Sequence, residues 1–185
     1  MSMTNFRKMI AKCEAEVNEL HQKLRKTVEH REKSSHQHEQ WQRAAKRFRE
    51  YHSPVYDIVE QCLKFGLLHD QKLREFAFEY INLDPYFFRS GYMLESLLQR
   101  VKKLPLTDSE KTSIQRLILR RIETRALRNF RRICRLIHMV DSEGFHSEVS
   151  NRAKSIDPQV KRRAEFALAY FPINGRRRGD GFIIM

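Results

Sequence analysis

The N-terminal stretch constrains the fold most, because neither glycine nor proline occurs before Pro54. These two residues disfavour the interior of a helix more strongly than any others. The whole chain holds only 6 Gly and 5 Pro in 185 residues, too few for a protein built of many short strands and turns. We therefore predict an all-α fold that begins with a long helix.

Apolar residues in this stretch recur at alternating spacings of four and three, which is the pattern of a coiled-coil seam. The seam fails after Leu24, and apolar spacing resumes only at Trp41. We expect one long helix, or two helices broken near Ser34-Ser35. The partner of the seam is either a second copy of the chain, which would make a homodimer, or a later helix of the same chain. The predicted oligomerisation residues are Phe6, Ile10, Cys13, Val17, Leu20 and Leu24.

Capping residues mark the later helix starts. A capping side chain followed by proline at the first helical position predicts three of them, and a capping residue alone or a capping box predicts two more. We divide the chain into a coiled-coil-like arm (1–52), a compact helical array (53–171) with a long helix over 108–141, and a basic tail (172–185). The three starts with proline are Ser53-Pro54, Asp84-Pro85 and Asp157-Pro158. The other two are Asp70, as a single capping residue, and Thr107 with Glu110, as a capping box.

The surroundings of two of these starts, "YINLDPYFF" and "AKSIDPQVK", are alike. Each has a helix end, an aliphatic residue, Asp-Pro and a new helix. This arrangement resembles the junctions of helical-hairpin repeats such as tetratricopeptide or HEAT units. The resemblance covers about nine residues at each site, and it implies stacked helical pairs.

The helix expected over 108–141 carries eight arginines between Arg116 and Arg135, opposed only by Glu123. On a helical wheel they occupy a face about 180° wide and roughly 30 Å long. Apolar residues occupy a separate face about 120° wide. The arginines are Arg116, Arg120, Arg121, Arg125, Arg128, Arg131, Arg132 and Arg135. The apolar residues are Ile118, Leu119, Ile122, Ala126, Phe130, Ile133, Leu136, Ile137 and Val140.

Four pairs of these arginines are like-charged at i,i+4, a spacing that costs a few tenths of a kcal/mol per pair. An anionic partner would relieve that repulsion, and guanidinium forks match phosphate oxygens. The sequence therefore predicts a non-enzymatic nucleic-acid-binding protein, for DNA or RNA, that contacts phosphates with little sequence preference. Two shorter basic runs would add contacts. These are Lys161, Arg162 and Arg163, and Arg176, Arg177 and Arg178.

Three other interpretations stay open. The arginine face could meet acidic side chains of the same chain or of a protein partner, which would make the chain a helical adaptor or scaffold. A basic helical dimer could instead bind an anionic membrane surface. Finally, "RICRLIH" fits the arginine–histidine pair of all-helical ribonucleases of the HEPN type, with Arg132 and His138 as its residues.

No catalytic, cofactor or metal site is predicted. His36 and His38 stand at i,i+2, where side chains diverge on a helix, and no further ligand is near them in the sequence. No secretory signal is visible in the sequence, and no apolar run is long enough to span a bilayer, so we expect neither a leader nor a membrane span. Its 3 Cys are odd in number and widely spaced. We expect reduced thiols acting as small apolar side chains, and an intracellular location, cytoplasmic or at the nucleoid or nucleus.

Overall fold

The computed structural model describes residues 3–127 and 129–172, and every regular element among them is a helix. The all-α prediction is confirmed. None of the described helices is both long and apolar enough to cross a membrane. The helices are α1 (Met3–Val28), α2 (Ser35–Glu50), α3 (Pro54–Phe65), α4 (Gln71–Leu83), α5 (Ser90–Val101), α6 (Asp108–Glu123), α7 (Phe130–Cys134), α8 (Ile137–Val140), α9 (Glu143–Arg152) and α10 (Pro158–Leu168).

The chain divides after Arg100 into two compact units. Unit 1 (residues 1–100) contains α1 to α4 and nearly all of α5, and unit 2 (residues 101–185) contains α6 to α10. The predicted division after residue 52 does not coincide with this boundary. The reason is that α1 packs against α3 and α4 as well as against α2, so the N-terminal helix belongs to the same core as the helices that follow it.

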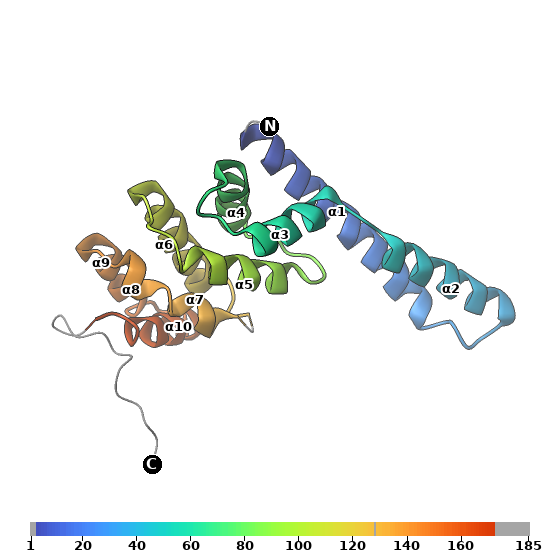
Figure 1. The fold of residues 1–185 in the computed structure, drawn as a ribbon. Helices are drawn as coiled ribbons and strands as arrows, with labels where there is room; N and C mark the ends of the chain where they lie inside the picture. The colour runs from blue at the N-terminus through green and yellow to red at the C-terminus, as the bar shows by residue number, and fades with distance from the viewer. Residues whose placement is uncertain (1–2, 128, 173–185) are drawn as a thin grey trace, which may run out of the picture. The chain divides into compact units, whose positions relative to one another are not determined.

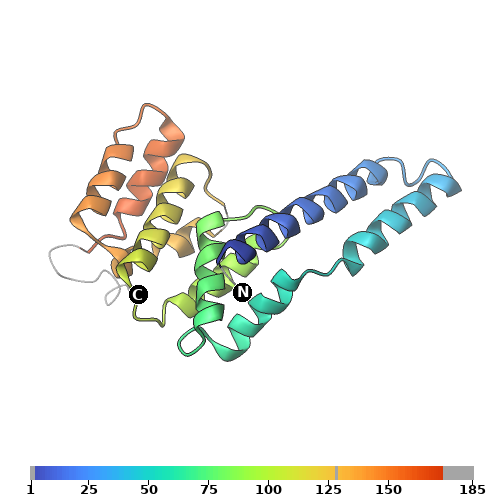
Figure 2. The same ribbon diagram turned by 90° about the horizontal axis from the view of Figure 1, so that it is seen from above.

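In unit 1, α1 and α2 form a hairpin and lie side by side (Figures 1 and 2). Of the two alternatives for this stretch, the structure has two helices broken near Ser34-Ser35, and Ser34 caps α2 by accepting a hydrogen bond from Gln37 N at 3.3 Å. The seam of α1 is covered by helices of the same chain, as one of the two alternatives predicts. Its first four residues are buried and its last two, nearer the loop of the hairpin, are half-buried. The buried ones are Phe6, Ile10, Cys13 and Val17, and the half-buried ones are Leu20 and Leu24.

Polar contacts fix α1 against the rest of unit 1. Arg7 forms a 2.7 Å ion pair with Glu79, a carboxylate that is only 5% exposed. Asn18 donates from its side chain to the carbonyl of Tyr86 at 2.9 Å, and the Tyr86 amide donates to Glu14 at 2.8 Å. One face of α1 is therefore held inside the unit, both by these polar contacts and by apolar packing against α3 and α4.

The two Asp-Pro sites differ in the structure. Asp157 caps α10 as predicted, and accepts a hydrogen bond from Gln159 N at 2.7 Å. Asp84 instead ends α4: its backbone is left-handed (φ 47°), and its amide donates to the carbonyl of Tyr80 at 3.0 Å. The predicted helix start at Asp84-Pro85 is therefore wrong, and α5 begins only at Ser90. The resemblance of the two sites to one kind of repeat junction does not extend to their backbone.

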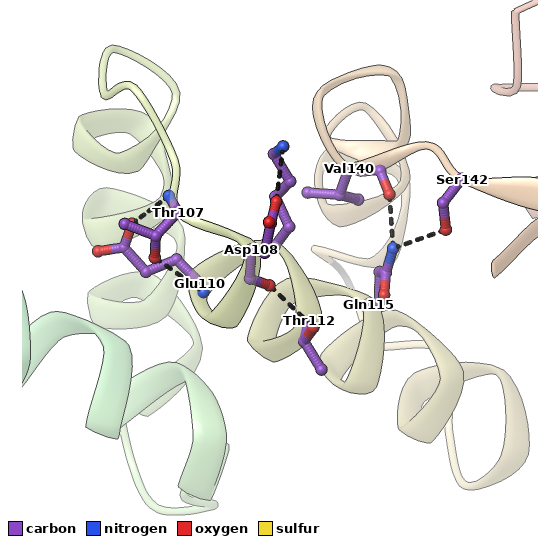
Figure 3. A network of polar contacts seen from close by, with 8 residues as sticks. Thr107, Asp108, Glu110, Thr112, Gln115, Val140 and Ser142 are labelled. Atoms are coloured by element: carbon purple, nitrogen blue, oxygen red, sulfur yellow. Dashed lines mark hydrogen bonds and ion pairs between the residues drawn. The ribbon is translucent and has the colours of Figure 1, made fainter. Parts of the chain in front are cut away.

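In unit 2, the start of α6 is fixed by the predicted capping box (Figure 3). Glu110 N donates to the Thr107 hydroxyl at 3.3 Å, and Thr107 N donates to the Glu110 carboxylate at 2.8 Å. One turn later, the Gln115 side chain donates to the carbonyl of Val140 at 2.7 Å and to the Ser142 hydroxyl at 3.3 Å. These bonds tie α6 to the junction of α8 and α9.

The prediction of one continuous helix over 108–141 is wrong, because α6 ends at Glu123 and the short helices α7 and α8 follow. A contact across the sequence is made at this end. Arg163 of α10 donates from Nε to the carbonyl of Ile122 at 2.6 Å and from Nη2 to that of Glu123 at 3.3 Å. A helix leaves its last carbonyls without partners inside the helix, and a cation there also interacts favourably with the helix dipole. Arg163 therefore stabilises an end that the local sequence does not mark with glycine or proline.

The cysteines behave as predicted. All three are buried and none forms a disulfide. Burial raises the pKa of the Cys62 thiol and of the Cys134 thiol to about 12. At neutral pH these groups are uncharged and pack as small apolar side chains.

Candidate functional site

The end of α6 at Glu123 distributes the predicted arginine face over several elements. A helical wheel is valid only while one helix continues, so the single 180° face does not exist. The structure leaves some of these side chains exposed, half-buries others and buries one. Arg116, Arg131, Arg132 and Arg135 are exposed, Arg120 and Arg125 are half-buried, Arg121 is buried, and Arg128 lies outside the described residues.

Arg121 differs most from its predicted place, since its side chain is only 1% exposed. It follows Leu117 by four residues and Ile114 by seven, and both of these are buried on the inward face of α6. Residues at these spacings share a face of a helix. The signal was therefore present in the sequence: a wheel centred on Ile114 and Leu117 places Arg121 on the core side. We remove Arg121 from the candidate site.

Three of the exposed arginines make no ion pair within residues 3–127 and 129–172. They are Arg116 on α6, and Arg131 and Arg135, which stand one turn apart at α7. The Arg135 amide donates to the Arg131 carbonyl at 3.3 Å, so their backbones are in successive turns. Like charges at this spacing repel each other.

Lys102, which is not among the predicted binding residues, is affected by the charge of one of these arginines. Partial burial lowers the pKa of Lys102, and the positive charge of Arg135 lowers it further. Lys102 is half-buried in the turn that follows α5, within unit 2. We define the second-unit cluster as Lys102, Arg131 and Arg135. Its members are linked by the effect of the Arg135 charge on Lys102 and by the backbone hydrogen bond between Arg135 and Arg131.

Other basic residues of unit 2 have structural partners. Arg163, a predicted binding residue, donates to the end of α6 as described above. Arg152 bridges two carboxylates, at 2.6 Å from Glu123 and 2.5 Å from Glu148, and is 22% exposed. Its hydrogen bonds to these carboxylates raise its pKa, although burial acts in the opposite direction.

The neighbours of Arg163 in the predicted run, Lys161 and Arg162, are exposed on α10, while Arg176, Arg177 and Arg178 lie outside the described residues.

The histidines singled out by the sequence lie on helix surfaces. His36 and His38 on α2 are exposed, and each is hydrogen-bonded to a glutamine four residues later, at 2.8 and 2.9 Å. Within the part of the chain that the structure describes, no three His, Cys, Asp or Glu side chains are grouped so as to hold a metal ion. Arg132 on α7 and His138 on α8 are both exposed, and a nuclease role for this pair stays a prediction.

Comparison with protein-family models, with curated proteins and with solved structures finds no match to this chain.

Proposed function

We propose that this chain is a non-enzymatic nucleic-acid-binding protein that contacts backbone phosphates through exposed cations of unit 2. The observation that carries the proposal is the second-unit cluster. Arg131 and Arg135 make no ion pair within the described residues, and Arg135 lies near enough to Lys102 to lower its pKa. A phosphate placed at this cluster would replace repulsion between cations with attraction.

The charge of the unit supports the same partner. From residue 101 onward the chain holds 19 basic and 9 acidic residues, which gives unit 2 a net charge of +10 out of +13 for the whole chain. A field of this sign attracts a polyanion and accelerates its association. Arg116 on α6 adds a further exposed guanidinium without an ion pair in the described chain.

The type of cation favours phosphate. Seven basic residues between Arg116 and Arg135 remain after Arg121 is removed, and all of them are arginine. The guanidinium group offers paired donors in a fixed geometry that matches two oxygens of a phosphate. Contacts to phosphates position a protein on a nucleic acid without reading its bases. We therefore expect weak sequence preference.

The direct test compares the variant R116E/R131E/R135E with the wild type by fluorescence anisotropy on labelled DNA and RNA. We expect binding to weaken at least about tenfold near 0.1 M salt. The control K8E/K64E/K72E makes the same change in net charge with exposed lysines of unit 1, and should retain most of the affinity. Circular dichroism checks that both variants keep their helices.

Two other results would point elsewhere. Equal losses in the two variants would show that only net charge matters, and the site would be wrong. No binding of the wild type to any nucleic acid, together with salt-sensitive binding to an acidic polypeptide such as polyglutamate, would favour an adaptor for an acidic protein.

A further inference from the structure

A groove on the α1–α2 hairpin gathers cations in a region that the sequence analysis treated only as a coiled-coil arm. The groove has a volume of about 470 Å³ and lies between the two helices of the hairpin. Its cationic residues come from both walls: Lys23 and Lys26 from α1, and Arg43 and Arg47 from α2. All four are exposed. The other lining residues are Leu20, Thr27, Gln40 and Ala44, so no acidic side chain lines it.

Elsewhere on the hairpin, some cations are paired with carboxylates at i,i+4, whereas others, such as Arg25 and Arg49, make no ion pair within the described residues. Lys12 lies 3.8 Å from Glu16, and Lys46 lies 3.9 Å from Glu50. Such pairs are typical of an ordinary solvated helix face.

The groove is distinguished by its lining, because four cations from two helices and no carboxylate line it. Lys23 pairs with Glu19, but Lys26, Arg43 and Arg47 make no ion pair within the described residues. Glu39 stands one turn before Arg43 on α2, yet it does not line the groove and forms no ion pair in the described chain. The two arginines are like-charged at i,i+4, about 6 Å apart along the axis.

We propose that this hairpin groove is a second phosphate-binding site, and that its ligand is the backbone of a nucleic acid. Cations on both walls can contact a phosphate chain from two sides, with arginines as paired donors on one wall and lysines as point charges on the other. His21 and Phe48 lie with their ring centroids 5.5 Å apart in a tilted arrangement, and no aromatic side chain lines the groove. The site therefore binds phosphates without base stacking, and its contacts are independent of sequence.

The test uses the full chain and the variant R43E/R47E, with a labelled single strand and a labelled duplex as probes. We expect affinity to fall at least about tenfold near 0.1 M salt. The matched control is R25E/R49E, which makes the same charge change with two exposed arginines of the same hairpin that do not line the groove. The control should stay within about twofold of the wild type. Thermal unfolding followed by circular dichroism verifies that the hairpin is intact.

Each contrary outcome separates this site from the second-unit cluster. If R43E/R47E binds like the wild type while R116E/R131E/R135E loses binding, the groove is not a binding site and the proposed function stands. If only R43E/R47E loses binding, the groove is the site and the role of unit 2 is wrong. Equal losses in R43E/R47E and R25E/R49E would overturn the groove. The proposal of a nucleic-acid site in the groove would also be overturned if R43E/R47E lost binding to vesicles of phosphatidylserine while its binding to nucleic acid did not change.

Discussion

The two units use their basic residues differently. Unit 1 holds 17 basic and 14 acidic residues, and at least five of its lysines and arginines form ion pairs with carboxylates, as Arg7 does with Glu79. Unit 2 holds 19 basic and 9 acidic residues, so most of its cations cannot have a carboxylate of their own. Some bind backbone carbonyls, as Arg163 does, and one, Arg121, is buried. The number of arginines in a sequence therefore overestimates the size of a binding surface, because some of the arginines are buried or bind the backbone of the same chain.

Local caps set helix starts in both units, but one helix end in unit 2 has a long-range contact. The ends of α2, α3 and α4 in unit 1 are fixed mainly by nearby residues, such as Ser34, Ser53 and Gly66. The end of α6 in unit 2 is fixed by Arg163, about forty residues later in the chain. We therefore expect the last turn of α6 to respond to a substitution about forty residues away, whereas the capped boundaries respond to local substitutions.

The largest expected effect is on the core of unit 1. The Phe76 side chain is fully buried, with its ring 5.5 Å from Phe6 and 6.1 Å from Tyr80. Phe76→Ala should lower the free energy of unfolding by about 3–5 kcal/mol, because it removes apolar contacts and leaves a cavity. Urea unfolding measures the loss. The control Phe88→Ala removes a ring that is 48% exposed and should cost far less; equal costs would contradict the assignment of Phe76 to the core.

A smaller effect on stability, of opposite sign at the two positions, is expected when Gly66 and Gly144 are replaced by alanine. Gly66 ends α3 with φ 78° and ψ −174°, a conformation nearly restricted to glycine, so Gly66→Ala should destabilise by about 1–3 kcal/mol. Gly144 is the second residue of α9, and an added Cβ there would meet nothing within 4 Å. Gly144→Ala should therefore stabilise, by up to about 0.5 kcal/mol, because a residue in the first turn gains less than one in the helix interior. Thermal unfolding of both variants tests the signs, and a loss of stability in Gly144→Ala would be contrary to the α9 geometry.

The long-range end of α6 should give an effect of about 1–2 kcal/mol. Arg163→Met keeps much of the side-chain length but removes the donors to Ile122 and Glu123. We expect lower stability and faster amide hydrogen exchange in the last turn of α6. Arg162→Met, at an exposed neighbouring position, is the control and should change neither. If both variants behave alike, the contact does not hold the end of the helix.

The fold was predictable from the sequence wherever local chemistry decides it. The α1 seam, the Ser34 cap and the Thr107–Glu110 capping box lie where the residue pattern places them. The division of 108–141 was not predictable, because the residue that stabilises the end of α6 lies on a different helix. Asp84 shows the same limit: its left-handed backbone ends a helix, although Asp followed by Pro more often begins one.

The candidate site was predictable only in part. Exposed Arg116, Arg131 and Arg135 were in the predicted set, and the buried place of Arg121 could have been read from Ile114 and Leu117. Lys102 could not be found in this way, because only the folded chain brings it near Arg135. The cations of the hairpin groove were likewise hidden, since they come from opposite walls of two helices.

The most direct test of the central claim is the salt dependence of nucleic-acid binding by the wild type and by R116E/R131E/R135E. Contacts from cations to phosphates release counterions, so log K should fall linearly with log salt. We expect a wild-type slope at least as steep as about −3, and a slope shallower by about 2–3 in the variant. Identical slopes for the two proteins, or wild-type binding that does not depend on salt, would contradict phosphate contact through these arginines.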